Sequence, residues 1–322
     1  MIASCPVVAL AGGVGGAKLA VGLAAALPPG ALTVIVNTAD DLTLHGLHIS
    51  PDLDTVMYNL AGLSDSGQGW GIKADTTGAL DLLGRYGGPT WFRLGDIDMA
   101  THIRRTQRLS EGARLTEVTA ELCSALNIQA RVLPMTDSPV ATRVMTPVGE
   151  LEFQDYFVAR GTRPHVTGVR FQGADSAEAT PEIFNALREA KTIVYCPSNP
   201  IVSLGPILAI KGIREGLREK LHRPRVGVSP IIGGAALRGP AAEMLKSLGH
   251  DVSALGAAEI LREYLDAFVI DEEDAHLLAS FEHSGIRARA AQSVMSDLSS
   301  KKRLAQEVLD FAENIRGQAS AG

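Results

Sequence analysis

Residues 7–23 read VVALAGGVGGAKLAVGL, an apolar run that passes through four glycines into alanine- and leucine-rich sequence. The apolar run predicts a buried strand, the glycines a tight turn, and the residues after them the start of a helix. Such a turn lets an anion approach the backbone, and the helix start offers free N–H groups and the positive end of the helix dipole. We therefore interpret these residues as a phosphate-binding turn; a tight turn without a ligand is the plain alternative.

The spacing of the glycines matches neither of the familiar nucleotide motifs. A dinucleotide fingerprint, G-x-G-x-x-G, can start at Gly13 but then has Lys18 in its last position. A P-loop, G-x-x-x-x-G-K-[ST], can start at Gly12 but then has Ala17 and Leu19 on either side of the lysine. An NAD-dependent dehydrogenase and a P-loop kinase are therefore disfavoured.

Short, continuously apolar runs alternate with helix-like segments along the chain. This alternation predicts an α/β fold with a doubly wound, mostly parallel, Rossmann-like sheet. Residues 130–180 change to short β-like pieces with a hairpin turn at 147–149, which predicts a small inserted α+β lobe within a single domain spanning residues 1–322. The expected strands are 7–11, 32–37, 192–196, 225–229 and 266–270, and the expected helices include 17–27, 240–248 and 298–316.

Composition and charge narrow the class of protein. A hydrophobic content of 46% supports a sizeable core, while a net charge of −6 without a lysine or arginine block argues against a nucleic-acid partner. No run reaches the ~18 apolar residues that a membrane span needs, and the N-terminal residues lack a secretory signal pattern. Cys5, Cys123 and Cys196 lie far apart without metal-ligand spacing, so we expect a cytoplasmic protein with reduced thiols.

The loop after the second expected strand carries four carboxylates, Asp40, Asp41, Asp52 and Asp54. In a dinucleotide-binding protein one of them, such as Asp40, would hold a ribose. Asp52 or Asp54 can also cap or begin the helix that follows Ser50. Several acids near a phosphate repel it unless a cation lies between them, so the loop favours a divalent cation held by carboxylates and phosphate oxygens.

A third polar stretch follows the apolar pair Trp91 and Phe92. Arg93 is expected on the last residue of a strand, where it can meet a ligand. Asp96 or Asp98 is expected to cap a helix that runs through residue 109.

Two later loops, 197–205 and 229–239, each follow an expected strand. Because the carboxyl ends of parallel strands lie on one edge of a sheet, we expect these loops to meet residues 12–16 and 37–55 there. Their neutral donors and the charge of Arg238 suit a nucleotide diphosphate and its base. The neutral donors are Ser198, Asn199, Ser203 and Ser229.

Taken in order, these segments resemble the 2-phospho-L-lactate transferase family (CofD/FbiA type) of coenzyme F-420 biosynthesis, from about residue 7 to beyond residue 290. A related group of YvcK-like proteins shares the glycine loop and the fold, but SPDLDT and RLGDIDMATHI favour the transferase branch. The segments are GGVGGAK (12–18), NTADD (37–41), SPDLDT (50–55), FRLGDIDMATHI (92–103), LPMTD (133–137), PSNP (197–200), SLGPI (203–207) and SPIIGG (229–234).

The resemblance implies a Rossmann-like transferase with an inserted lobe, usually a homodimer, that needs Mg²⁺. Such enzymes move a phospho-carboxylate unit from a guanosine-diphosphate carrier to the ribityl hydroxyl of 7,8-didemethyl-8-hydroxy-5-deazariboflavin and release GMP. The resemblance leaves open whether the donor carries lactate, enolpyruvate or glycerate. A YvcK-like regulatory protein that binds a nucleotide or nucleotide sugar without turnover is the alternative.

The resemblance also assigns roles to residues. It implies that Asp54 and Arg93 contact the deazaflavin, and that Asp40 and Asp41 lie where the magnesium ion or the attacking hydroxyl sits. Asp40 and Asp54 are the candidate catalytic residues, as a proton acceptor or as a metal ligand. The implied nucleotide-binding residues are Gly12, Gly13, Gly15, Gly16, Ser198, Asn199, Ser229 and Gly233.

Overall fold

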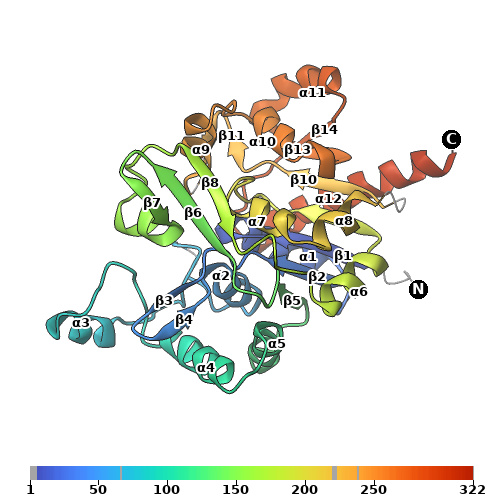
Figure 1. The fold of residues 1–322 in the computed structure, drawn as a ribbon. Helices are drawn as coiled ribbons and strands as arrows, with labels where there is room; N and C mark the ends of the chain where they lie inside the picture. Colours follow the sequence, from blue (N-terminus) through green and yellow to red (C-terminus); the bar gives the residue numbers. More distant parts are fainter. Residues whose placement is uncertain (1–5, 66, 220–222, 238, 322) are drawn as a thin grey trace.

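Seven parallel strands form the central sheet of the protein in a computed structural model (Figure 1), in the order β14-β13-β10-β9-β1-β2-β5. The structure describes residues 6–65, 67–219, 223–237 and 239–321, so Cys5 and Arg238 lie outside the described residues. The strands of the sheet are β1 (Val7–Ala11), β2 (Leu32–Val36), β5 (Arg131–Pro134), β9 (Thr192–Tyr195), β10 (Arg225–Val228), β13 (Ala267–Asp271) and β14 (Arg287–Ala291).

The predicted doubly wound α/β fold is confirmed, including the five expected strands. The two strands that the sequence analysis missed lie at the edges of the sheet. β14 reads RARAA, which is not a continuous apolar run, and β5 reads RVLP, which ends in a proline, a residue that argues against a strand. The expected strand that would end at Arg93 is wrong, because residues 91–95 form bends and irregular backbone.

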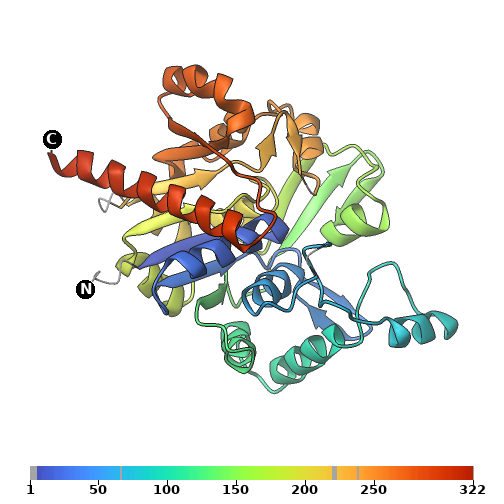
Figure 2. The same cartoon turned by 180° about the vertical axis from the view of Figure 1, so that it is seen from behind.

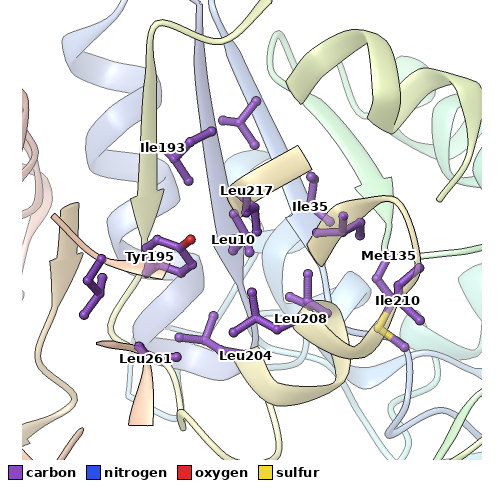
Figure 3. Close-up of a cluster of buried hydrophobic side chains, with 14 of the residues drawn as sticks. Leu10, Ile35, Met135, Ile193, Tyr195, Leu204, Leu208, Ile210, Leu217 and Leu261 are labelled. Atoms are coloured by element: carbon purple, nitrogen blue, oxygen red, sulfur yellow. The ribbon is translucent and has the colours of Figure 1, made fainter. Parts of the chain in front are cut away.

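Helices cover both faces of the sheet. Val7, Ala9 and Ala11 of β1 point toward one face, where they pack with α1, α2 and α12. Val8 and Leu10 point toward the other face. Figure 3 shows that second cluster, in which Leu10 lies with side chains of β2, β9, α7 and α8. The helices named here are α1 (Gly13–Ala26), α2 (Pro51–Leu60), α7 (Leu204–Ala209), α8 (Ile213–Arg218) and α12 (Leu298–Ala321).

The last helix, α12, packs closely against the first, α1, and Figure 2 shows the two side by side. The contact depends on Gly22, because a Cβ at this position would lie 2.1 Å from the carbonyl oxygen of Lys301. Leu19, Leu23 and Leu304 fill the apolar part of this interface. α1, the helix that starts at the glycine turn, is therefore held between the sheet and α12.

Residues 61–114, which we call the α3–α4 arm, leave the sheet between β2 and β5, and α3 projects from the body (Figure 1). Asp96 was one of the two residues expected to cap α4, but it does not cap that helix. Its carboxylate accepts from the Gly78 and Ala79 N–H groups at the start of α3. Asp75 in turn accepts from Ile97 and Asp98 at the start of α4, so each helix is capped by the segment that precedes the other. The arm and its flanks contain β3 (Leu42–Leu44), β4 (Leu47–Ile49), α3 (Gly78–Arg85), α4 (Asp98–Ser110) and α5 (Leu115–Ala125).

A separate antiparallel sheet, β7-β6-β8, lies in the region predicted as an inserted lobe. The hairpin expected at 147–149 joins β6 to β7, whereas residues 131–134 belong to the main sheet.

None of the helices in the described part of the chain has the length and apolar character required to cross a bilayer. The remaining elements are β6 (Ala141–Thr146), β7 (Gly149–Glu152), β8 (Gly168–Gln172), α6 (Pro181–Glu189), β11 (Ile231–Ile232), β12 (Ala235–Ala236), α9 (Ala241–Ser247), α10 (Ala254–Ile260) and α11 (Leu278–Ser284), with short π or 3-10 turns at Asp155–Ala159, Arg262–Tyr264 and Glu272–Leu277.

Candidate functional site

A cavity of about 440 Å³ opens at the carboxyl edge of the parallel sheet. Residues from the loops after β1, β2, β9 and β10 all line it, so the predicted convergence of these loops is confirmed. The segment after β14 also contributes, through Ser293, Val294 and Met295, and this contribution was not foreseen. The edge where the strand order reverses is where open α/β sheets usually bind their ligands.

The glycine turn, residues 12–16, forms one wall of this cavity through Gly12, Gly13 and Gly15. Two of its glycines allow close packing: a Cβ at Gly15 would lie 2.2 Å from the Pro197 carbonyl oxygen, and one at Gly16 would lie 2.7 Å from the Ser198 hydroxyl. Gly13 begins α1 with a φ of +64°, a conformation that favours glycine. Gly16 itself is buried and does not line the cavity.

The Gly13 N–H at the start of α1 donates to a carboxylate of the protein itself. Asp52 Oδ1 accepts it at 2.8 Å, although Asp52 lies in the first turn of a different helix, α2. From the sequence, Asp52 is expected as a helix cap or helix start, or as one of four carboxylates near a divalent cation. Its contact with Gly13 was not predicted, and it places an anion at the positive end of α1.

Asp52 and Asp40 form a pair of carboxylates on the cavity wall. The Asn37 side-chain amide donates to both, at 2.9 Å to Asp40 Oδ2 and 3.1 Å to Asp52 Oδ2. Burial raises the pKa of Asp52 to about 6, and burial together with the charge of Asp52 holds the pKa of Asp40 well above its usual value. Asp40 Oδ1 is buried and has no hydrogen-bond partner within the described part of the protein.

Asp41 was predicted to lie beside Asp40 at the magnesium ion or the attacking hydroxyl, but its carboxylate contacts other residues. Its Oδ2 accepts from the Ser50 hydroxyl at 2.6 Å and lies 3.0 Å from His48 Nε2. Burial raises the pKa of Asp41, while the bond from His48 opposes the rise. The carboxylate does not line the cavity, and the partner of Asp40 there is Asp52.

Asp54 also lies outside the cavity. It is buried and forms a two-armed ion pair with Arg105, with Arg105 Nη1 3.1 Å from Asp54 Oδ2 and Nη2 on the other oxygen. His102 Nδ1 lies 3.6 Å from the same carboxylate. In this arrangement Asp54 joins α2 to α4 of the α3–α4 arm.

Arg93 is exposed and lines a neighbouring hollow of about 110 Å³ rather than the main cavity. Trp70 lines both spaces, so the hollow and the cavity adjoin at this side chain. The contact between Arg93 and the deazaflavin stays a prediction.

The polar residues expected to bind a nucleotide fall into two groups. Ser198, Asn199 and Ser229 line the cavity, but each also shapes its own loop: the Ser198 hydroxyl exchanges bonds with the Gly12 backbone, Asn199 accepts from Ile201, and the Ser229 hydroxyl donates to the Ile231 carbonyl. Gly233 does not line the cavity. Its N–H donates to the buried carboxylate of Asp274.

Lys18 supplies a positive charge to the cavity. Its side chain lines the wall, and Nζ donates to the Met295 carbonyl oxygen at 2.9 Å. The bond ties α1 to the segment after β14. Phe153, Phe157 and Trp70 give the cavity an aromatic side as well.

Together, the fold and the site define an α/β protein whose ligand cavity lies at the carboxyl edge of a doubly wound sheet. A family model described as "2-phospho-L-lactate transferase CofD" matches residues 7–312. The chain belongs to this CofD family of transferases.

Similar proteins carry two names. A "2-phospho-L-lactate transferase" from Methanosarcina mazei is 41% identical over 298 residues, which cover 92% of this chain and 97% of that protein. A "phosphoenolpyruvate transferase" from Streptomyces griseus is 42% identical over 319 residues, which cover 96% of this chain and 99% of that protein. The crystal structure of a member of the UPF0052 family from Bacillus halodurans superposes with a TM-score of 0.65 at 15% identity, covering 95% of this chain and 99% of that one, and shows the same fold.

Proposed function

We propose that this protein transfers a phospho-carboxylate unit from a guanosine-diphosphate-linked donor to the ribityl hydroxyl of 7,8-didemethyl-8-hydroxy-5-deazariboflavin and releases GMP. The observation that carries the proposal is the cavity in which the glycine turn meets the carboxylates of Asp40 and Asp52, in a chain of the CofD family. Its volume of about 440 Å³ is in the usual range for small-molecule sites.

The chemistry follows from charge. The ribityl oxygen attacks the phosphorus of the phospho-carboxylate unit, a new P–O bond forms, and the bond from that phosphorus to the bridging oxygen breaks, so that this oxygen leaves with GMP. The glycine turn brings backbone rather than bulky side chains to the cavity wall, so it can hold the diphosphate in line with the attacking hydroxyl. Asp40 is suited to accept the hydroxyl proton, because its pKa is raised and its Oδ1 has no partner among the described residues.

Asp40 and Asp52 also fit a magnesium ion. Carboxylate oxygens are the ligands that Mg²⁺ prefers, and it commonly uses one or two of them together with phosphate oxygens and water. The described residues contain no group of three or more His, Cys, Asp or Glu side chains arranged to hold a metal, so the remaining ligands would come from the donor and from water. When bound, Mg²⁺ neutralises the charge that develops on the diphosphate. We assign its protein ligands to Asp40 and Asp52, with Asp41 holding the loop through Ser50 and His48.

A direct test incubates the protein with Mg²⁺, the deazaflavin and each of three donors, the guanosine diphosphate derivatives of lactate, enolpyruvate and glycerate. We expect GMP release by chromatography, and a deazaflavin product whose mass identifies the preferred acid. GDP binding without GMP release from any donor would contradict the transfer reaction and would favour the alternative, a regulatory protein that binds a nucleotide or nucleotide sugar.

We also propose that the protein is a homodimer that associates through the α3–α4 arm. Large apolar side chains stand exposed there, including Tyr86 at 77%, Ile97 at 56% and Ile103 at 55%. Exposed apolar surface of this kind marks an interaction site, and a closed homodimer is the commonest way to cover it.

A further inference from the structure

We infer that Trp70 is the residue on which the flat ring system of the acceptor stacks, an inference that rests on the proposed transfer to a deazaflavin. Two independent observations support it: the shared position of Trp70 between two hollows, and the rigid attachment of its loop to the glycine turn.

The position of Trp70 is the first observation. Its side chain lines the main cavity, with Asp40 and Asp52, and also the adjoining hollow, with Arg93. A ring system on Trp70 would therefore lie where the space lined by the two carboxylates adjoins the space lined by Arg93. This arrangement reconciles the contact expected for Arg93 with its location outside the cavity.

Of the aromatic side chains that line the cavity, the two phenylalanines already have a ring partner, whereas Trp70 has none among the described residues. Phe153 and Phe157 stack on each other, with ring centroids 5.6 Å apart and planes at 19°. Among the described residues no ring or cation stacks on Trp70, and the side chain is 39% exposed. A tricyclic heteroaromatic ring gains most from such a free indole face.

The backbone of this loop is the second observation. Trp70 lies between Gly69 and Gly71, whose φ values are +79° and +68°. A Cβ at Gly69 would lie 2.4 Å from Val14 Cγ1, so the loop presses directly on the glycine turn. The Asn59 side-chain amide donates to the Gly69 carbonyl oxygen at 3.1 Å and fixes the loop to α2.

These contacts hold the backbone next to Trp70 in place relative to the phosphate-binding wall. The acceptor's ring would be positioned by the same loop that touches the turn holding the donor's diphosphate. Trp70 is thus a positioning residue for the acceptor, and its loss should affect acceptor binding far more than donor binding.

The two tryptophans of the chain make a matched test possible. Trp91 lines neither space and packs edge-on against Phe92, with centroids 5.7 Å apart at 81°. We expect the deazaflavin to quench tryptophan fluorescence in the wild type and in Trp91→Phe, but not in Trp70→Phe. In Trp70→Ala, the Kd and the KM for the deazaflavin should rise about 10- to 100-fold, with the KM for the donor and the affinity for GDP nearly unchanged.

The outcomes separate this inference from the proposed function. If the wild type transfers the unit and Trp70→Ala binds the deazaflavin as tightly as the wild type does, the stacking role is wrong and the transferase proposal stands. If the wild type neither binds the deazaflavin nor releases GMP, the proposed function fails and the stacking role fails with it. GDP affinity and thermal unfolding of each variant confirm that it is folded; should Trp70→Ala unfold, Trp70→Phe with its quenching readout decides the matter.

Discussion

Asn37 holds two carboxylates that would otherwise repel each other, since its single amide nitrogen donates to both Asp40 and Asp52. The arrangement keeps negative charge beside a cavity that we expect to receive a diphosphate. The buried pair is unfavourable without a proton or a cation: burial raises the pKa of both groups, and the charge of Asp52 raises the pKa of Asp40 further.

Replacing Asp40 with Asn should lower kcat by about 100- to 10,000-fold, because the variant loses the carboxylate that is proposed to accept the proton or to hold magnesium. GMP release at saturating Mg²⁺, donor and deazaflavin measures the effect. Asp310→Asn, a change at an exposed position of α12, is the matched control and should leave turnover unaltered. Near-wild-type turnover of Asp40→Asn would remove Asp40 from the mechanism.

Replacing Asp52 with Asn should change how stability depends on pH. A folded-state pKa of about 6, above the ordinary 3.8, means that the stabilising contribution of this group is full below pH 4 and is lost as the pH rises through 6. The Asp52→Asn variant carries no titrating group there and has no such loss, so between pH 4 and pH 8 it should gain about 1–3 kcal/mol in free energy of unfolding relative to the wild type. Urea unfolding at both pH values measures the difference, and parallel pH profiles would show that the pKa of Asp52 is ordinary.

At the scale of elements, α2 and the α3–α4 arm meet through a buried charge pair. Arg105 and Asp54 are both buried, and their two-armed contact joins α4 to α2. α2 also carries Asp52, so the position of one cavity carboxylate depends on this helix being held in place.

Removing one partner of this pair should be costly, because it leaves an uncompensated buried charge. We expect Arg105→Met to lower the free energy of unfolding by about 3–5 kcal/mol, and Asp54→Leu added to it to recover a large part of the loss. Arg104→Met is the control: Arg104 is the exposed neighbour, paired with Glu121 at the surface, and its loss should cost no more than about 1 kcal/mol. Equal effects of the two arginine variants would contradict the role of the buried pair.

The sequence predicted the strands that are buried on both faces, because burial forces a continuous apolar run such as VVALA in β1. It did not predict β14, where alternating arginine and alanine hide an edge strand. Nor could it separate Asp52 from Asp54, two residues apart in α2. Only the folded chain shows that Asp52 faces Gly13 and that Asp54 faces Arg105, since the partners lie 39 and 51 residues away in sequence.

At the scale of the whole molecule, the loops after β1, β2, β9 and β10 were expected to meet because the carboxyl ends of parallel strands lie on one edge of a sheet. The cavity that these loops line confirms the expectation. The contributions of Trp70 and of residues 293–295 did not follow from any local signal. Trp70 belongs to the α3–α4 arm, which leaves the sheet between β2 and β5. The spacing of residues in the sequence does not predict which part of such an arm packs back against the cavity.

The proposed dimer gives a prediction at this scale. The double variant Tyr86→Glu, Ile103→Glu should behave as a monomer in light scattering after size-exclusion chromatography, where the wild type should have twice that mass. Val148→Glu places the same charge on another exposed apolar side chain, outside the arm, and should not change the mass. A wild-type mass corresponding to one chain would contradict the dimer.

The packing of α12 on α1 has a consequence for how the protein is made on the ribosome. α1 is synthesised long before α12, yet Leu304 and Val308 of α12 pack in the same buried cluster as Leu19, Ala20 and Leu23 of α1. Until α12 has been made, the apolar side of α1 therefore lacks its cover, a state that attracts chaperones and self-association. Ribosome-stalled chains ending before residue 298 should accordingly be cut readily by protease near α1, and chains that include α12 should resist.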